Sequence, residues 1–258
     1  MKKETKNTES VIEIRNLKKS FGTKEVLKNI SLSLQKEENL VVLGKSGTGK
    51  SVLIKCIVRL LKADAGEIEV FGEDVNTLEK GKLDDVRKRI GFLFQSGALY
   101  DSMTVRENLE FPLRRIKKGL SEAEISAKVN EVLENVGLAE ALNKMPSELS
   151  GGMRKRISLA RTIIVDPDII LYDEPTTGLD PVTSNEISML INDIQKKYKT
   201  SSIVITHDME CVRTVADRII MLKDGEVYKN GNLTEFEKDS DEYISSFFKG
   251  QNVELNKK

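Results

Sequence analysis

The chain has 258 residues, with 41 Lys plus Arg balanced by 41 Asp plus Glu, so its formal net charge is zero. A chain of this length commonly folds as one α/β domain, and a zero net charge supplies no overall field that would draw it onto nucleic acid or anionic lipid. No window approaches the run of about 18 apolar residues that a membrane-spanning helix needs, and the start of the chain lacks the apolar run of a secretion signal. These features predict a cytosolic protein without a nucleic-acid partner, which reaches a membrane only through a protein partner.

The predicted elements begin after residues 1–9, which are polar and charged and which we expect to be disordered. Residues 11–22 and 25–35 alternate apolar and polar side chains, a pattern typical of half-buried strands. Residues 39–44 form a short, continuous apolar run, as in strands that are covered on both faces. The sheet is therefore predicted to be mixed, with an antiparallel fringe beside a parallel centre.

A helical region is predicted in the middle of the chain. After a glycine-rich loop, residues 51–63 carry apolar side chains at helical spacing, and residues 65–72 and 90–95 have the pattern of strands. From about residue 96 to residue 163 the pattern is almost wholly helical, which predicts a helical subdomain inserted into the sheet domain.

One helix of this subdomain is outlined clearly by its sequence. Ser121 and Glu124 form a capping box at its start, and Gly137 is placed to end it. These signals predict an amphipathic helix between Ser121 and Gly137. Its expected apolar stripe consists of Ala123, Ile125, Val129, Val132, Leu133 and Val136.

Strands return in the last third of the chain. Residues 168–174 and 201–207 contain apolar runs, and between them a helix is expected to begin at Asp180, which can cap it and which is followed by a proline. Asp224 and Gly225 are expected to form the turn of a hairpin. This alternation of buried strands and helices predicts a parallel sheet with helices on both faces, whose ligands bind beyond the carboxyl ends of the strands.

The glycine-rich loop that follows residues 39–44 has the chemistry of a phosphate site. It matches GxxxxGK followed by serine, in the strand-to-helix context that this motif requires. The glycines let successive backbone N–H groups point at an anion, and the helix start adds the positive end of its dipole. Lys50 is placed to reach the β and γ phosphates of a nucleotide, and the Ser51 hydroxyl suits Mg²⁺. The expected nucleotide-binding residues of this loop are Gly44, Lys45, Ser46, Gly47, Thr48, Gly49, Lys50 and Ser51.

A glycine-rich turn that precedes a helix by chance is the plainer interpretation of this loop. With glycine near ~7% of residues, a chance match in a chain of this length is expected on the order of one per cent of the time. The strand and helix on either side lower that figure further, so the motif predicts binding of a nucleoside triphosphate. It does not choose among kinases, GTPases and transport ATPases, because all of them carry it.

Two carboxylates end the apolar strand at the sheet edge where a nucleotide is expected. Asp173 is predicted to hold the Mg²⁺ shell, and Glu174 is predicted to orient or deprotonate the attacking water. The alternative is a pair of solvated carboxylates at a strand-to-loop junction. The four apolar residues before them and the phosphate loop elsewhere in the chain favour catalysis.

Two further features are ambiguous when each is taken alone. Ser150 is placed to cap a helix whose first N–H groups Gly151 and Gly152 expose, which is either a second anion site or simply a capped helix with a basic first turn. His207, the only histidine, ends an apolar strand that we expect to neighbour the strand of Asp173. A solitary histidine is more often structural than catalytic, but this position would bring its ring near the γ phosphate and the attacking water.

Over about residues 10–230 the chain resembles ATP-binding cassette (ABC) ATPases, because six of its segments occur in the order found in that family. They are the loop GKSGTGKS, Gln95, the segment LSGGM, the strand end ILYDEP, the turn TTGLD and His207. The resemblance implies an α/β fold: a P-loop NTPase with a RecA-like mixed and parallel sheet core, an antiparallel β fringe and an inserted helical subdomain. It also implies one ATPase domain over residues 10–245 with a tail at 246–258.

The resemblance implies that two copies of the chain form a head-to-tail homodimer. In that family, the phosphate loop of one subunit and the LSGG turn of the other clasp each ATP. Ser150, Gly151 and Gly152 would then bind the γ phosphate of the nucleotide held by the partner. This arrangement explains why one chain would need two anion-binding helix starts.

The same resemblance implies roles for three more residues. Gln95 would sense Mg²⁺ and the attacking water, which makes it both a metal-shell and a catalytic residue. Asp180 would link the two sites of the dimer, and Phe21 would stack on adenine. Phe21 offers a ring without a hydroxyl, and Met153 stands where many ABC proteins have glutamine, but neither departure removes a catalytic group.

Within that family, the chain is similar to the ATPases of bacterial lipid-asymmetry (Mla), or Mce-type, transporters, which move phospholipid between the two membranes of the envelope. The similar segments are FQSGALYDSMTVRENLEFPLRR, MPSELSGGMRKRISLAR and DEYISSFFKG. The resemblance implies a peripheral protein on the cytoplasmic face of the inner membrane. It also implies an integral, MlaE-like permease whose cytoplasmic helix docks near Gln95 and the helical subdomain.

These features lead to the hypothesis of an ATPase that energises a phospholipid permease. Another cargo, such as amino acids or lipoproteins, fits the same motifs because the ATPase itself touches no cargo. The rival from a different class is a soluble ABC protein that acts on ribosomes or DNA. Such proteins usually have two cassettes or a long coiled coil, whereas this sequence has one phosphate loop, no sustained heptads and no basic excess.

Overall fold

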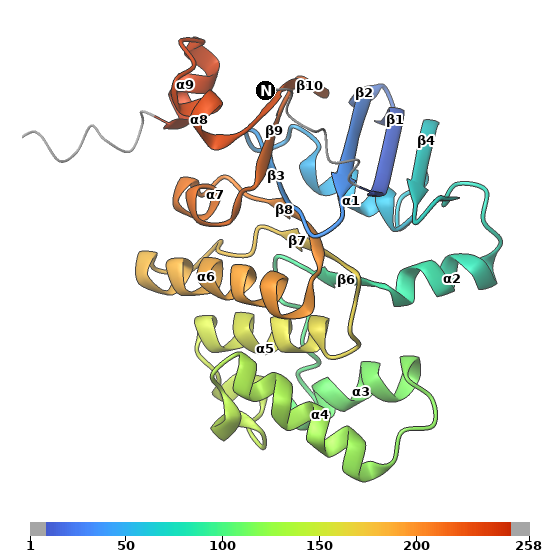
Figure 1. The fold of residues 1–258 in the computed structure, drawn as a ribbon, viewed down its shortest axis with the longest axis vertical. Coiled ribbons are helices and arrows are strands. Elements are labelled where there is room, and N and C mark those ends of the chain that lie inside the picture. The colour runs from blue at the N-terminus through green and yellow to red at the C-terminus, as the bar shows by residue number, and fades with distance from the viewer. Residues whose placement is uncertain (1–8, 249–258) are drawn as a thin grey trace, which may run out of the picture.

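The computed structural model describes residues 9–248, and within this range ten strands form one sheet (Figure 1). The strands are β1 Ser10–Phe21, β2 Lys24–Gln35, β3 Asn39–Leu43, β4 Ala65–Val70, β5 Glu73–Asp74, β6 Ile90–Leu93, β7 Ile169–Asp173, β8 Ser201–Ile205, β9 Arg218–Lys223 and β10 Glu226–Gly231. They lie in the order β5-β4-β1-β2-β10-β9-β3-β8-β7-β6. The strands from β9 to β6 in this order are parallel to one another, whereas β5, β4, β1 and β2 pair antiparallel, so the predicted mixed sheet is confirmed.

Helices cover both faces of this sheet. In the described part of the chain they are α1 Lys50–Ile57, α2 Lys80–Lys88, α3 Val105–Ile116, α4 Glu122–Asn135, α5 Gly151–Ile163, α6 Pro181–Tyr198, α7 Met209–Val215, α8 Leu233–Glu237 and α9 Glu242–Phe248. Helices α3, α4 and α5 follow β6 and form a lobe at one end of the molecule, on the far side from the antiparallel strands (Figure 1). None of the helices between residues 9 and 248 combines the length and the apolar content that crossing a membrane requires.

The core has two apolar clusters, one on each face of the sheet, and the buried strand β3 contributes to both. Val41 and Leu43 belong to the cluster that includes the helical lobe, α6 and α7, whereas Leu40 and Val42 belong to the cluster that includes α1 and the antiparallel strands. Alternate residues of a strand point to opposite faces, so a continuous apolar run is buried on both sides. This burial fixes the carboxyl end of β3, from which the phosphate loop starts.

Several local predictions are confirmed. Helix α4 starts with the capping box of Ser121 and Glu124, in which each residue accepts a hydrogen bond from the other's backbone N–H. Asp180 caps α6 and accepts from two N–H groups of its first turn. Asp224 and Gly225, with φ of 52° and 83°, form the turn between the antiparallel strands β9 and β10.

Helix α1 is shorter than predicted, because it ends at Ile57 and not at residue 63. Arg59 adopts a left-handed conformation with φ of 50°, and the Leu60 N–H donates to the Lys55 carbonyl at 2.8 Å, which closes the helix. The Arg59 guanidinium also donates to carbonyls of the loop between β5 and α2. After the helix end, Val58 is buried and Leu61 and Ala63 are partly buried against the core, whereas Leu60 is 55% exposed.

The region after β6 also departs from the prediction. The strand ends at Leu93, two residues before Gln95, and residues 94–104 form turns, so that the first helix of the lobe begins only at Val105. Gly97 and an adjacent alanine have φ of 79° and 50°, which neither a helix nor a strand accommodates. In the α4 stripe, Ala123 is exposed because it lies in the first turn, while the other five predicted positions are buried.

The predicted limits of the domain lie near the two ends of the described residues. The expected disorder over residues 1–9 falls almost entirely outside the described residues, as does most of the tail at 246–258. Helix α9, however, continues past residue 245, where we expected the tail to begin. Phe248 is buried, with its ring centroid 6.0 Å from that of Phe236, so apolar packing accompanies the helix three residues past that boundary.

Candidate functional site

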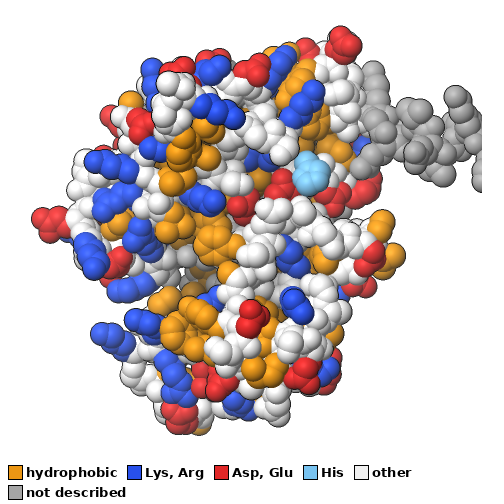
Figure 2. All heavy atoms as spheres, turned by 180° about the vertical axis from the view of Figure 1, so that it is seen from behind, with side chains coloured by type: hydrophobic (Ala, Val, Ile, Leu, Met, Phe, Trp, Pro, Cys, Tyr) orange, Lys and Arg blue, Asp and Glu red, His pale blue; other side chains and the backbone are white. Residues whose placement is uncertain are grey.

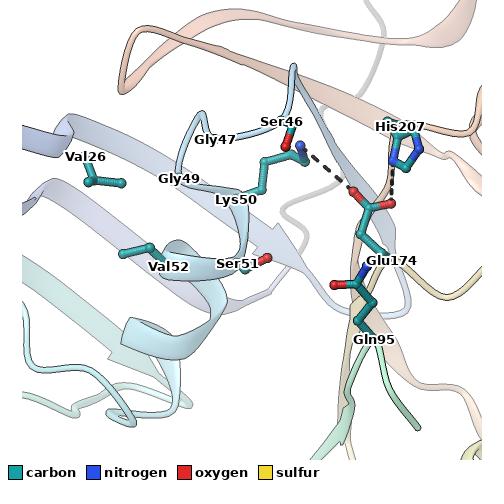
Figure 3. A pocket seen from close by; sticks show the side chains of 10 residues that line it. All are labelled: Val26, Ser46, Gly47, Gly49, Lys50, Ser51, Val52, Gln95, Glu174 and His207. Carbon is teal, nitrogen blue, oxygen red and sulfur yellow. Dashed lines mark hydrogen bonds and ion pairs between the residues drawn. The ribbon is translucent and has the colours of Figure 1, made fainter. Parts of the chain in front are cut away.

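The glycine-rich loop joins β3 to α1 and lies at the carboxyl end of the parallel strands (Figure 3). Gly47 and Gly49 have φ of 82° and 95°, which residues with a side chain rarely adopt. A Cβ on Gly49 would lie 2.6 Å from the Leu27 side chain, and one on Gly44 would lie 2.7 Å from the Leu222 carbonyl oxygen. The loop is therefore held closely by β2 and β9, and only glycine fits at these positions.

A cavity of about 510 Å³ opens beside this loop, a volume in the usual range for a small-molecule site. Its lining residues come from the segments that directly follow the four neighbouring parallel strands β3, β8, β7 and β6. Val26 and Val52 add apolar surface. The predicted site residues that line it are Ser46, Gly47, Gly49, Lys50, Ser51, Gln95, Glu174 and His207.

Lys50 is buried at the floor of this cavity, with 6% of the residue exposed. Its Nζ donates to the carbonyls of Gly44 and Lys45, at 2.7 and 3.2 Å, and lies 4.0 Å from Oε1 of Glu174. Burial lowers the pKa of Lys50, while the negative charges of Glu174 and Asp173 oppose that effect. A desolvated ammonium group held by neutral carbonyls is suited to binding an anion as strong as a phosphate.

Ser51 and Asp173 lie side by side across the floor of the site. The Ser51 hydroxyl donates to Oδ1 of Asp173 at 2.7 Å. Ser51 and Gln95 line the cavity (Figure 3). A hydroxyl, a carboxylate and an amide are the oxygen donors that Mg²⁺ prefers, so these residues fit the ion. Residues 9–248 contain no group of three or more His, Cys, Asp and Glu side chains placed for a metal.

Glu174 is fixed over the cavity by contacts on several sides. Its Oε2 lies 2.8 Å from Nδ1 of His207 and 3.3 Å from the Thr177 hydroxyl, and its N–H donates to the Ile205 carbonyl at 2.9 Å. Its backbone is left-handed, with φ of 51°, a conformation that costs roughly 1–2 kcal/mol for a residue with a side chain. Such strain is retained where the surroundings hold it, and it clusters at active sites.

The position of His207 follows from strand pairing. Strands β7 and β8 are parallel neighbours with Asp173 opposite Ile205, which confirms the expectation that the histidine strand lies next to the Asp173 strand. The His207 side chain is 64% exposed, and Figure 2 shows it at the surface with acidic side chains nearby. It can therefore meet both Glu174 and a group that enters from outside.

The turn of Ser150, Gly151 and Gly152 does not line the cavity of Lys50. Ser150 caps α5 and accepts from the Met153 N–H at 3.3 Å, with the two glycines as the first residues of the helix. A Cβ on Gly152 would lie 2.6 Å from the Thr183 side chain, so this turn packs against the start of α6.

Asp180 and Phe21 also do not line that cavity. Among the other predicted site residues, the same holds for Gly44, Lys45, Thr48 and Asp173. Asp180 accepts hydrogen bonds from the hydroxyl and the N–H of Thr183 and from the Val182 N–H at the start of α6, and these bonds hold its pKa below the usual range. Phe21 ends β1 with 47% of the residue exposed, and the Lys19 ammonium lies 5.5 Å from its ring centroid.

Lys155, the fifth residue of α5, was not among the predicted site residues. Its side chain is buried, with 6% of the residue exposed, and its Nζ donates to the Gln95 carbonyl at 2.7 Å. The signal available in the sequence was its spacing, because Lys155 precedes the buried residues Ser158 and Leu159 by three and four positions and so shares their face of the helix.

Comparison with known families agrees with this geometry. The sequence profile of the ABC transporter family matches residues 27–177, and the fold and site define an ABC-type ATP-binding domain. Methionine import ATP-binding protein MetN of Rhizobium johnstonii is 39% identical over 226 residues, which are 88% of this chain and 62% of that protein. The probable ribonucleotide transport ATP-binding protein mkl of Mycobacterium leprae is 43% identical over 211 residues, 82% of this chain and 60% of that protein. The chain belongs to the ABC transporter family.

Solved structures confirm the fold class. A dimeric, post-hydrolysis state of the ATP-binding cassette MJ0796 bound to ADP and Pi has a TM-score of 0.79 at 34% identity and covers 86% of this chain and 98% of its own. CbiO1 of Clostridium perfringens, part of the ABC transporter complex cbiONQ, has a TM-score of 0.80 at 26% identity and covers 95% and 92% of the two chains. The chain spans only about three fifths of the length of the two relatives named above.

Proposed function

We propose that this chain is the ATP-hydrolysing subunit of an ABC transporter. The observation that carries the proposal is the Glu174 carboxylate, which is held 2.8 Å from Nδ1 of His207 and 4.0 Å from Nζ of Lys50 at the carboxyl ends of parallel strands. A carboxylate that is fixed between the lysine of the phosphate loop and a histidine is suited to activating water for attack on a phosphoryl group.

In the proposed reaction, the N–H groups of the phosphate loop and the Lys50 ammonium bind the β and γ phosphates of ATP. Ser51, Asp173 and Gln95 would hold Mg²⁺, which when bound neutralises charge on the β and γ phosphate oxygens. The Glu174 carboxylate orients the attacking water and accepts its proton. His207 holds that carboxylate through Nδ1 and lies close enough to stabilise charge that develops on the γ-phosphoryl group.

We also propose that the working form is a head-to-tail homodimer. In support, Ser150, Gly151 and Gly152 present helix N–H groups but do not line the cavity of their own chain. In the dimer they would contact the γ phosphate bound by the partner, and Asp180, next to them at the start of α6, would link the two sites. Phe21, with its exposed ring at the end of β1, would stack on adenine.

The test of the enzymatic proposal is Glu174→Gln in the full chain. Removal of a general base is expected to lower kcat by about 100- to 1000-fold, while the affinity for ATP changes by no more than about threefold. Phosphate release and nucleotide titration measure the two quantities. Glu237→Gln, a change of the same chemistry in an exposed ion pair with Arg213, is the matched control and should hydrolyse ATP at the native rate. Undiminished hydrolysis by Glu174→Gln would refute the role of Glu174.

For the cargo we propose phospholipid, moved through an integral permease of the Mce type. The support is the similarity of residues 94–115 and 145–161 to the ATPases of such transporters. The relatives named for methionine import and ribonucleotide transport make these cargoes the alternatives. The test reconstitutes the ATPase with its copurified permease in vesicles. ATP-dependent transfer of labelled phospholipid supports the proposal, and transfer of methionine in its place overturns it.

The proposed location is the cytoplasmic face of the inner membrane, where the permease would dock near Gln95 and the helical subdomain at about residues 96–163. Purification from detergent extracts tests this proposal. A multi-spanning protein recovered in stoichiometric amount supports it, whereas recovery of ribosomal material supports the rival reading of a soluble ABC protein.

A further inference from the structure

Helix α5 is fastened along one face to the loop that follows β6. Lys155 Nζ donates to the Gln95 carbonyl at 2.7 Å, and Arg161 Nη1 donates to another carbonyl of that loop at 2.9 Å. Between them, Ser158 lies so close that a Cβ on Gly97 would be 2.6 Å from its hydroxyl oxygen. Residues three apart share one helix face, so the helix that starts at the Ser150 turn and the Gln95 loop form one packed unit.

Lys155 also reaches the loop that carries the proposed general base. Its Nζ lies 3.4 Å from the Glu174 carbonyl oxygen as well as 2.7 Å from that of Gln95. Burial lowers the pKa of Lys155, and the charges of Asp173 and Glu174 oppose that effect. A buried amine requires polar partners, and this one takes them from the backbones of two separate catalytic loops.

The contact from Lys155 is to the backbone of Glu174, where a change of conformation would move the proposed general base. Its left-handed conformation, with φ of 51°, is uncommon for a residue with a side chain. The N–H of Glu174 is held by the Ile205 carbonyl at 2.9 Å, and its carbonyl is approached by Lys155 at 3.4 Å. A rotation of this backbone would turn the carboxylate away from His207 and the phosphate loop.

We propose that Lys155 is a positioning residue for ATP hydrolysis, which fixes the backbones of Gln95 and Glu174 from the helix that begins at Ser150. It acts through these two residues and contacts neither the nucleotide nor the water. It therefore ties the geometry of the general base to the position of the helix that would serve the partner's nucleotide. The proposal rests on the proposed function, because it concerns the arrangement of that same site.

The first test is Lys155→Met in the full chain together with its permease. Because a small displacement of a catalytic group lowers the rate strongly, kcat should fall by about tenfold or more, with KM and the affinity for ATP changed by less than about twofold. Lys155→Arg keeps donors at this position and should restore part of the rate. Thr162→Val is the matched control, because Thr162 is buried in the same helix and its hydroxyl donates only within that helix, to Ser158.

A double-variant comparison tests whether Lys155 acts through Glu174. If it does, adding Lys155→Met to Glu174→Gln should lower single-turnover hydrolysis much less than it lowers the native rate. An independent structural role would instead multiply the two losses, and that result would overturn the proposal. An unchanged kcat in folded Lys155→Met would also overturn it.

Hydrolysis by the native chain distinguishes failure of the proposed function from failure of this proposal. Failure of the native chain to hydrolyse ATP would contradict the proposed function before any variant is compared. If thermal unfolding shows that Lys155→Met does not fold, Lys155→Gln replaces it, since the shorter side chain keeps a donor but does not reach both carbonyls. A lowered kcat at unchanged ATP affinity then supports the proposal, and a native kcat overturns it.

Discussion

Two helix starts in this chain suit anions, but their surroundings differ. The start of α1 lies beside a cavity of about 510 Å³, with the buried Lys50 at its floor and Glu174 opposite. The start of α5 has a capping serine and two glycines but does not line that cavity. The first region is therefore preorganised within one chain, whereas the second supplies donors whose proposed ligand lies in another copy. Substitutions in the first region should impair the nucleotide site of the chain that carries them, whereas substitutions in the second region should impair the site of its partner in the dimer.

The largest effect is expected for Lys50→Met, which removes the buried charge of the first region. Turnover should fall by about 1000-fold and the affinity for ATP should weaken, because the phosphates lose their closest cation. Phosphate release and nucleotide titration measure both quantities. Lys62→Met is the matched control, since Lys62 is exposed after the end of α1 and does not line the cavity. An equal loss in both variants would mean that general charge, not the buried position, matters.

A mixing experiment tests whether the two regions act in different copies. Lys50→Met disables the phosphate loop and Ser150→Phe disables the LSGG turn, so each variant alone should be inactive. In an equal mixture about half of the dimers are mixed, each with one intact site, so about a quarter of the native turnover per site should return. A mixture that stays inactive while mixed dimers are detected by cross-linking would contradict a shared site.

A smaller effect is expected from two serines that cap helices in the same way. Ser150 and Ser121 each accept from an N–H three residues later at 3.3 Å, so Ser150→Ala and Ser121→Ala should each lower the free energy of unfolding by about 1 kcal/mol. Only Ser150→Ala should lower turnover as well, by about tenfold, because only that turn is proposed to meet a phosphate. Urea unfolding and phosphate release are the measurements. Equal turnover in the two variants would reduce the Ser150 turn to a simple helix cap.

The last prediction concerns the loop that follows β6, and its measurement is stability. Gly97→Ala should lower the free energy of unfolding by about 1–2 kcal/mol, because φ is 79° and the new Cβ would lie 2.6 Å from the Ser158 hydroxyl. Adding Ser158→Ala removes that hydroxyl, so the double variant should recover part of the loss in urea unfolding. No recovery would mean that backbone strain alone accounts for the effect.

Much of the fold could be predicted because its signals are local. The glycine spacing, the apolar run before it, the capping box at Ser121 and the Asp224-Gly225 turn each depend on a few adjacent residues, and the structure contains all of them. The proximity of Glu174 and His207 was also predictable, because parallel strands with the same pattern end at one edge of the sheet.

What could not be predicted depends on contacts between distant segments. Helix α1 ends early because Arg59 donates to a loop about 15 to 20 residues later, which the spacing of apolar residues does not reveal. Lys155 was not among the predicted site residues, since its partner Gln95 lies 60 residues away in the chain. The turns at residues 94–104 replaced an expected helix because two adjacent residues with positive φ follow Gln95, and only one of them is glycine.

The strand order β3-β8-β7-β6 has a consequence for the spacing of the site. Neighbouring strands in any sheet repeat at about 4.8 Å, so the phosphate loop, the histidine, the carboxylates and the glutamine are distributed over about 14 Å by the hydrogen-bond ladder itself. This distance does not depend on the number of residues that connect these groups along the chain. Insertions or deletions in the connecting helices should leave the distances between these site residues unchanged. Loss of one of these strands from the sheet would instead change the distances between the residues on its two sides.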